Sequence, residues 1–175
     1  MYSRLPVFAS MQTYAAAIKC WARSRDKVKA IQAKSLLDWC EEQHRRGNQN
    51  ARPTVVIYNH VLNACAYTAG SNDDKIMEEA FRIGCLAFEE LRRSTTIRPN
   101  HISFANFLDV VSNLMPEGEL HDQLIGNIFR GCIREGVVSN IVIRRLRGAT
   151  SADLFESLLG DVNAKFLPQH WTRNL

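Results

Sequence analysis

The sequence predicts an all-α fold, a short α–α superhelical solenoid of about three helix–turn–helix repeats with a C-terminal helical cap. The first observation is the stretch 53–70, where apolar residues recur at helical spacing between a proline and Gly70, residues typical of helix starts and ends. The second is that residues 101–104, after a polar turn at 97–100, begin the same pattern again. The third is that no segment shows the alternation or the Asn-Gly and Asp-Gly turns of β-hairpins.

The predicted organisation is one array of helix pairs between two end segments. We expect an irregular lead over residues 1–10, the array over 11–148 (repeats at about 11–54, 55–100 and 101–140), and a capping helix and tail over 149–175. Within the tail, residues 166–171 are expected to fold back over the last apolar face. Helical spacing predicts helices over 11–24, 27–46, 55–69, 73–93, 101–114, 119–134, 140–147 and 152–159.

Composition limits the class of protein without defining a partner. A chain of 175 residues is long enough for a single modest domain or a short array, and its formal charge of +4 suits an anionic partner without requiring one. No apolar run reaches the roughly 18–20 residues of a membrane span, so no membrane association is expected. We expect the five cysteines to be buried free thiols of a reducing compartment, because they form no C-x-x-C pair and no ligand spacing with histidine. They are Cys20, Cys40, Cys65, Cys85 and Cys132.

Catalysis is not expected. The sequence contains no phosphate-binding loop, no H-E-x-x-H or G-x-S-x-G phrase and no zinc-deaminase pattern, and its aspartates are scattered. No metal, cofactor or small-molecule substrate is therefore predicted. There is no secretory signal. The first 25 residues lack Asp and Glu, as organelle transit peptides do, but residues 11–25 already have the pattern of a structural helix.

Three rings occupy the same place in successive first helices. Tyr14, Tyr58 and Phe104 are 44 and 46 residues apart, and each stands near the start of a predicted helix. In the first pair Tyr14 and Trp21 are expected to face inward, and Trp39 is among the apolar residues of the second helix. The recurrence predicts one structural unit repeated three times.

At these residues the sequence resembles the pentatricopeptide repeat family. Residues 55–62, VVIYNHVL, match the family's opening phrase without a gap, and residues 128–140 match its closing phrase. Residues 87–91 with 97–100 match the same ending with one extra residue, so the resemblance covers about residues 10–148. The spacings of 44 and 46 exceed the family's period of about 35, which places the additions in turns and helix extensions. A tetratricopeptide array is the nearest competitor, but its hallmark phrases are not met in register.

The resemblance implies single-stranded RNA binding at about one base per repeat, in mitochondrial or plastid transcript processing, stability or translation. In the family, the residue after the Tyr and the last residue of the unit contact the base edge. The implied pairs here are Ala15 with Thr54, Asn59 with Asn100, and Ala105 with Asn140. Only Asn59 and Asn100 offer two amides, and these two residues have an alternative role as helix caps. Bases would be sandwiched near Ile57, two residues before Asn59, and likewise near Gln12 and Ile102.

Basic residues are further candidates for RNA contact, at the phosphates. One cluster lies near the first inter-helix turn and a second near the C-terminus; a solvated surface is the alternative for both. Three repeats alone do not predict tight RNA binding, which would need further repeats, a partner or self-association. The second functional hypothesis is a protein-interaction scaffold resembling a tetratricopeptide array, whose concave groove holds a peptide or helix. The basic residues are Lys19, Arg23, Arg25, Lys27, Lys29 and Lys34 in the first cluster, and Arg144, Arg145 and Arg147 in the second.

Overall fold

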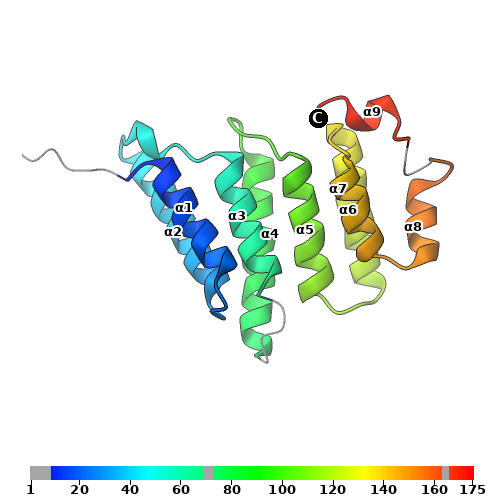
Figure 1. The fold of residues 1–175 in the computed structure, drawn as a ribbon, viewed down its shortest axis with the longest axis horizontal. Helices are drawn as coiled ribbons and strands as arrows, with labels where there is room; N and C mark the ends of the chain where they lie inside the picture. Colours follow the sequence, from blue (N-terminus) through cyan, green and yellow to red (C-terminus); the bar gives the residue numbers. More distant parts are fainter. Residues whose placement is uncertain (1–8, 69–72, 163–165) are drawn as a thin grey trace, which may run out of the picture.

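The computed structural model describes residues 9–68, 73–162 and 166–175, and those residues form helices and connecting segments with no strand (Figure 1). The predicted irregular lead falls mostly outside the described residues, as does the helix-closing Gly70. The helices are α1 (Met11–Arg23), α2 (Lys29–Arg45), α3 (Val55–Ala66), α4 (Asp74–Arg93), α5 (His101–Leu114), α6 (Glu119–Glu135), α7 (Asn140–Gly148), α8 (Ala152–Leu159) and α9 (Gln169–Thr172), with a short 3-10 turn at Gln49–Ala51.

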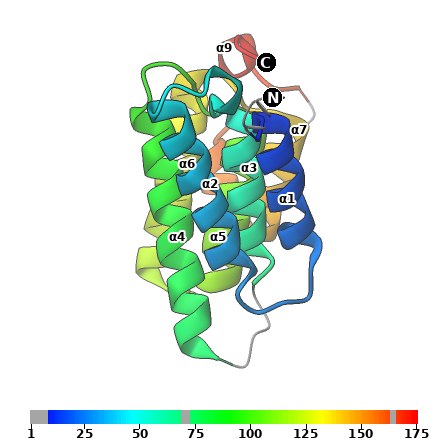
Figure 2. The same ribbon diagram turned by 90° about the vertical axis from the view of Figure 1, so that its left-hand side faces the viewer.

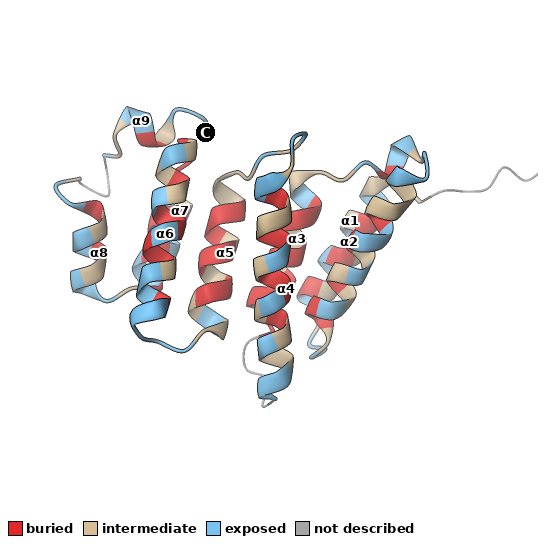
Figure 3. Cartoon of the chain, turned by 180° about the vertical axis from the view of Figure 1, so that it is seen from behind, coloured by how far each residue is buried: buried red, intermediate tan, exposed pale blue. Residues whose placement is uncertain are grey.

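The helices pack in two layers. α1, α3, α5 and α7 lie side by side in the first layer, and α2, α4 and α6 form the second layer behind them in the view of Figure 1. Figure 2 shows the two layers end-on, with the second layer on the left. Each first-layer helix packs on its neighbours in the same layer, and α2, α4 and α6 each pack on a first-layer helix. Buried residues, red in Figure 3, alternate with exposed ones along the helices of both layers. At the C-terminal end, α8 packs on α6 and α7, and α9 packs on α6.

Local chemistry explains where the helices begin and where they differ from expectation. Ser10 and Ser139 cap α1 and α7 by accepting backbone N–H groups at 3.3 and 3.4 Å. The second helix begins at Lys29 rather than at residue 27 because Asp26 Oδ1 accepts from the Val28 N–H at 2.9 Å, which holds a turn there. The helix expected over 55–69 ends at Ala66, and its last described turn is closed by the Thr68 hydroxyl.

The three rings that recur in the sequence are all buried between the layers. Tyr14, Tyr58 and Phe104 are each the fourth residue of a first-layer helix, and they are 6%, 5% and 2% exposed. Phe104 packs edge-on against Phe88 of α4 at 5.4 Å between ring centroids. Tyr14 meets Trp39 of α2 edge-on at 6.3 Å, but Trp39 itself is 59% exposed and lies at the rim rather than in the core. Trp21 is only partly buried.

The C-terminal tail folds back on α6, as the sequence predicts. Trp171 is buried and packs edge-on against Phe129 at 5.5 Å, and its carbonyl accepts the Val138 N–H at 2.8 Å. Gly136 makes the required turn at the end of α6 with φ of 69°, a left-handed conformation that glycine adopts at low cost. Phe166, expected to join this contact, is 79% exposed.

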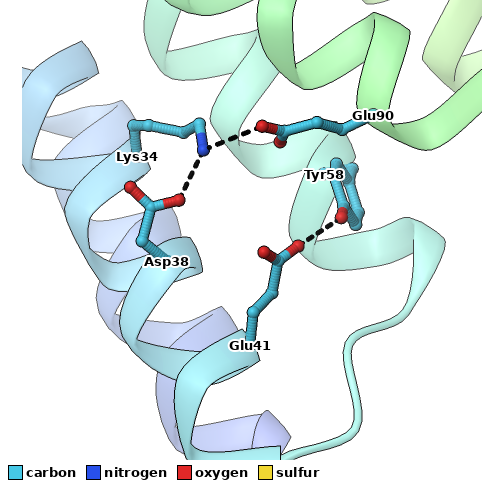
Figure 4. Close-up of polar contacts among 5 residues, drawn as sticks. All are labelled: Lys34, Asp38, Glu41, Tyr58 and Glu90. Carbon is cyan, nitrogen blue, oxygen red and sulfur yellow. Dashed lines mark hydrogen bonds and ion pairs between the residues drawn. The ribbon is translucent and has the colours of Figure 1, made fainter. Parts of the chain in front are cut away.

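A polar cluster joins α2, α3 and α4 at their shared border (Figure 4). The Lys34 ammonium of α2 donates to the Asp38 carboxylate one turn away and to Glu90 Oε1 of α4 at 3.3 Å. The Tyr58 hydroxyl of α3 donates to the Glu41 carboxylate of α2. The Lys34 ammonium therefore pairs with two carboxylates, Asp38 and Glu90, while a third carboxylate of the cluster, Glu41, is bound by the Tyr58 hydroxyl.

The pKa shifts within this cluster reflect that imbalance. Burial lowers the pKa of Lys34, but the hydrogen bond to Asp38 and the charges of Glu90 and Asp38 outweigh burial, and the pKa lies above its ordinary value. Burial raises the pKa of Glu90, and the neighbouring charges of Glu41 and Asp38 raise it further in spite of Lys34. The surrounding charges therefore stabilise the charged form of Lys34, whereas the charged form of Glu90 is destabilised.

The Glu90→Gln substitution should therefore stabilise the protein more at neutral pH than in acid. A carboxyl group whose folded pKa is raised binds protons more tightly in the folded chain, so the wild type loses stability as the pH rises from about 4.5 through the raised value, and glutamine escapes that loss. Urea unfolding of both proteins at pH 3.5 and pH 7 measures the difference. Lys34→Met is the contrasting variant, since it removes the shared cation and should lower the free energy of unfolding at pH 7 by about 1–2 kcal/mol. A smaller advantage of the glutamine variant at pH 7 than at pH 3.5 would contradict this account.

The cysteines differ in exposure, which corrects the expectation that all five are buried. Cys40, Cys65 and Cys132 are buried, Cys85 is partly exposed, and Cys20 is exposed on α1; all five are free thiols. Burial raises the pKa of Cys40 to about 11 and that of Cys132 to about 12, so neither thiol ionises near neutral pH. Cys20 follows Lys19 on α1, and both residues are exposed, away from the core face of the helix.

Iodoacetamide at pH 8 should alkylate Cys20 first and Cys85 more slowly, while the three buried thiols react only on unfolding. Peptide mass spectrometry over a time course gives the order directly. Cys20→Ser should abolish the fast phase and leave the remainder of the time course unchanged. Early labelling of Cys65 or Cys132 in the folded protein would be incompatible with the core described above.

Candidate nucleic-acid interface

The structure brings Asn59 and Asn100 together, but their amides face each other. Asn59 Nδ2 donates to Asn100 Oδ1 at 3.2 Å, and the Ser103 hydroxyl donates to Asn59 Oδ1 at 2.7 Å. Asn100 Oδ1 also accepts the N–H groups of Ile102 and Ser103, both at 3.1 Å. Ser103 Oγ in turn accepts the Asn100 N–H at 3.1 Å, which completes a capping box at the start of α5. Asn59 is only 8% exposed. The pair joins α3 to α5 and caps a helix, which is the alternative role that the sequence left open.

Of the residues expected to sandwich bases, Ile57 has no exposed surface to offer. It is the third residue of α3 and is 0% exposed, because it turns toward the core. The second residue of α3 is Val56, and Gln12 and Ile102 are the second residues of α1 and α5. Val56 is 48% exposed, so it, and not Ile57, is equivalent to Gln12 and Ile102. A register error of one residue moves a side chain by about 100° around a helix, from surface to core.

The remaining residues implied by the family resemblance lie at different depths. Ala105 is 2% exposed and cannot meet a base edge, whereas Ala15 is partly exposed on α1. Thr54 precedes α3, and its hydroxyl donates to Met11 Sδ at 3.6 Å. Asn140 is exposed at the start of α7, after its cap Ser139. The structure therefore places the second residue of each predicted pair at or next to a helix start, with unequal access to solvent.

Two asparagines of α5 that the sequence did not indicate link α5 to α3. Asn106 Nδ2 donates to the Asn59 carbonyl at 2.9 Å, and Asn113 Nδ2 donates to the Ala66 carbonyl at 3.2 Å. The two donors are seven residues apart and so lie on one side of α5, two turns from each other. Sequence periodicity did not reveal them, because polar residues on a helix surface are the ordinary case.

The outer face of the first layer combines cations with exposed apolar side chains. Lys19 and Arg23 are exposed on α1, and they lie close enough to His60 of α3 to affect its pKa, which is lowered first by burial and then by these two charges. Val56, on the same side of α3 as His60, is 48% exposed, and Tyr67, the C-cap residue of α3, is 54% exposed. Cations beside an exposed aromatic ring suit a phosphate backbone and its bases.

The second basic cluster lies on α7 in the same layer. Arg145 Nε pairs with Asp109 Oδ2 of α5 at 3.2 Å, and the Arg147 guanidinium lies 4.7 Å from the centre of the Phe155 ring of α8. Arg144 is exposed and forms no ion pair with any described residue. The cluster is therefore partly engaged within the protein and partly available.

Only part of the first basic cluster is accessible for phosphate contact. Lys27 is exposed in the turn between α1 and α2, and Arg25 is exposed beside it. Lys29 is 8% exposed, its ammonium donates to the Ser24 carbonyl at 2.9 Å, and burial lowers its pKa. Lys34 belongs to the carboxylate cluster of Figure 4. Lys29 and Lys34 therefore have structural partners.

Charge is distributed unequally between the two layers. Helices α1, α3, α5 and α7 contain five Lys and Arg residues and one acid, Asp109, a balance of +4. Helices α2, α4 and α6 contain nine Lys and Arg residues and eleven acids, a balance of −2. The excess positive charge thus belongs to the first layer, the layer that carries Val56 and Tyr67. Counting charge by alternate helices would have revealed this difference from the sequence.

Two other kinds of site find no support in the described parts of the chain. No group of three or more His, Cys, Asp and Glu side chains there could hold a metal ion. No described helix has both the length and the apolar character needed to cross a bilayer.

Comparison with known proteins gives no relative. No protein-family model matches the chain, and neither the curated proteins nor the solved structures include one that is similar to it. The geometry above is therefore the basis for a functional proposal, together with the resemblance described under Sequence analysis.

The Asn59–Ser103 contact should behave as a structural link between α3 and α5. Asn59→Ala and Ser103→Ala should each lower the free energy of unfolding by about 1–3 kcal/mol, because each leaves a buried polar group without its partner. In the double variant the two losses should not add, and the coupling energy from a double-mutant cycle should be about 1 kcal/mol or more. Additive losses would show that the two side chains do not depend on each other.

Proposed function

We propose that this protein binds single-stranded RNA across the outer face of its first layer, formed by α1, α3, α5 and α7. The observation that supports the proposal most is the charge distribution, with a balance of +4 on this layer and −2 on the other. An RNA backbone is attracted to the first layer and repelled by the second. The exposed Tyr67 ring offers a surface for base stacking on the attractive side.

The proposal includes a repeat architecture of the pentatricopeptide type. A polar residue precedes each first-layer helix, namely Ser10, Thr54, Asn100 and Ser139, and the fourth residue of each of these helices is buried. That common register supports three copies of one unit followed by the start of a fourth. Action on mitochondrial or plastid transcripts is proposed from the family resemblance alone.

The mode of recognition we propose is backbone attraction and stacking rather than base-edge reading. Asn59 and Asn100 use their amides within the protein, and Ala15 and Ala105 have no hydrogen-bonding side chain. Five cations on the layer predict a salt dependence of log K with a slope of at most about −3.5, at about 0.7 per phosphate on a single strand. Binding of this kind is sensitive to salt and tolerant of sequence.

Lys19→Gln with Arg23→Gln should weaken binding of a fluorescent single-stranded RNA by roughly tenfold at 100 mM salt and reduce the slope by about 1.4, since two phosphate contacts are lost. Fluorescence anisotropy at four salt concentrations gives both quantities. The matched control is Lys75→Gln with Arg82→Gln, which removes two exposed cations from α4 in the second layer. Equal effects of the two double variants, or no binding by the wild type at about 10 μM, would refute the proposed interface.

Tyr67→Ala should weaken the same complex by about 1–3 kcal/mol without changing the salt slope, because stacking involves no counterion release. Trp39→Ala is the matched control, an exposed aromatic residue of the second layer. A larger loss from the Trp39 substitution would place the bases on the other layer.

A further inference from the structure

A groove of about 530 Å³ lies between α4 and α6, on the layer opposite the proposed RNA-binding face. In the second layer α2 packs on α4, whereas α4 and α6 do not pack closely, and α5 is visible between them from this side (Figure 3). The floor of the groove is formed by Phe88, Phe104 and Phe107. Phe88 stacks on Phe107 at 4.2 Å between ring centroids, so the floor is rigid as well as apolar.

The walls present apolar side chains that the chain itself leaves uncovered. On the α4 side these are Cys85, which is partly exposed, and Leu86, which is 42% exposed. On the α6 side Leu124 is partly exposed, and Gly131 has no side chain; a Cβ added there would lie 3.5 Å from the Phe104 ring. A mainly apolar groove between two parallel helices suits the apolar face of an amphipathic helix.

The charges of the groove lie mainly at one end. Arg92 and Arg134 line it near the C-terminal ends of α4 and α6. The one acid that lines it, Glu89, pairs closely with Arg93 at 2.8 Å and more loosely with Arg92 at 3.9 Å, so Arg92 keeps most of its donors for a ligand. Arg134 lies over the floor, because a Cβ added at Gly131 would come within 3.7 Å of its guanidinium. Two guanidinium groups at the end of an apolar groove are complementary to carboxylates at one end of an apolar helix.

We propose that this groove binds an amphipathic helix of a protein partner, oriented antiparallel to α4 and α6, with acidic residues in its first turn. In that orientation the N-terminus of the partner helix lies beside Arg92 and Arg134, and acidic side chains are favoured at a helix N-terminus. The apolar stripe of the partner contacts Leu86, Leu124 and the phenylalanine floor. The site is independent of the RNA proposal, since it uses none of the residues of the first layer's outer face.

A display library of helix-forming 15-residue peptides, selected on the wild-type protein, tests the proposal. The enriched peptides are expected to share acids in the first turn and an i, i+4, i+7 apolar stripe. A synthetic peptide of the enriched sequence should lose at least tenfold in affinity for Gly131→Leu, which fills the floor, and for Arg92→Glu with Arg134→Glu. Leu86→Asp, a change at a partly exposed position, tests the wall without disturbing the core. Lys75→Glu with Arg82→Glu is the matched charge control on α4 and should bind the peptide as the wild type does.

Three outcomes overturn the proposal. The first is that no peptide is enriched, and the second is that the enriched peptides bind the Leu86→Asp and Gly131→Leu variants as tightly as the wild type. The third is that sedimentation shows a wild-type dimer that either groove variant dissociates, because the occupant is then a second copy of this chain. RNA affinity measured on the same variants separates the two proposals, since groove variants should leave it unchanged.

Discussion

The structure depends on burying one large side chain at a fixed distance from the start of each first-layer helix. Tyr14, Tyr58, Phe104 and Ile143 are each the fourth residue of their helix, and all four are buried. Fixing that residue toward the second layer fixes the rotation of the whole helix, because side chains follow at about 100° per residue. The second, sixth and ninth positions then turn away from the second layer, and in α3 these are Val56, His60 and Asn63, followed on the same side by the C-cap residue Tyr67. The core residue thus determines which side chains form the proposed binding surface.

The polar contacts between neighbouring helices follow from the same register. Because α3 and α5 have matching rotations, Asn106 and Asn113 of α5 reach the carbonyls of Asn59 and Ala66, which are likewise seven residues apart. The Tyr58 hydroxyl, directed toward α2, meets Glu41 beside the ammonium of Lys34 (Figure 4). These contacts are explained by the packing of neighbouring helices alone. The Asn59–Asn100 pair is explained in the same way, as a link between helices rather than as a base reader.

Much of the fold could be predicted from sequence, because helix spacing, caps and the recurring ring are local signals. The start of α5 at His101 and both ends of α8 agree with the prediction. The candidate site was harder to predict, because a register error of one residue changes the direction of a side chain by about 100° around the helix. Taking Ile57 in place of Val56 exchanged a core side chain for a surface one. The exposure of Cys20 and Trp39 was missed because an apolar or sulfur-containing side chain is usually, but not always, buried.

The two proposed binding surfaces differ because neighbouring helices pack together throughout the first layer but not throughout the second. In the first layer every neighbouring pair of helices packs together, so only polar tips and a few apolar side chains reach its outer face. In the second layer α4 and α6 do not pack closely, and the phenylalanine cluster that anchors α5 becomes the floor of a groove. A continuous face with cations on α1 and on α7 suits a flexible polyanion, which can reach both groups of cations along its length. An interrupted layer with an aromatic floor suits a preformed apolar ridge. Because the two proposed binding faces share no surface residue, occupation of one does not sterically exclude occupation of the other, and the two proposals together describe an adaptor between an RNA and a protein.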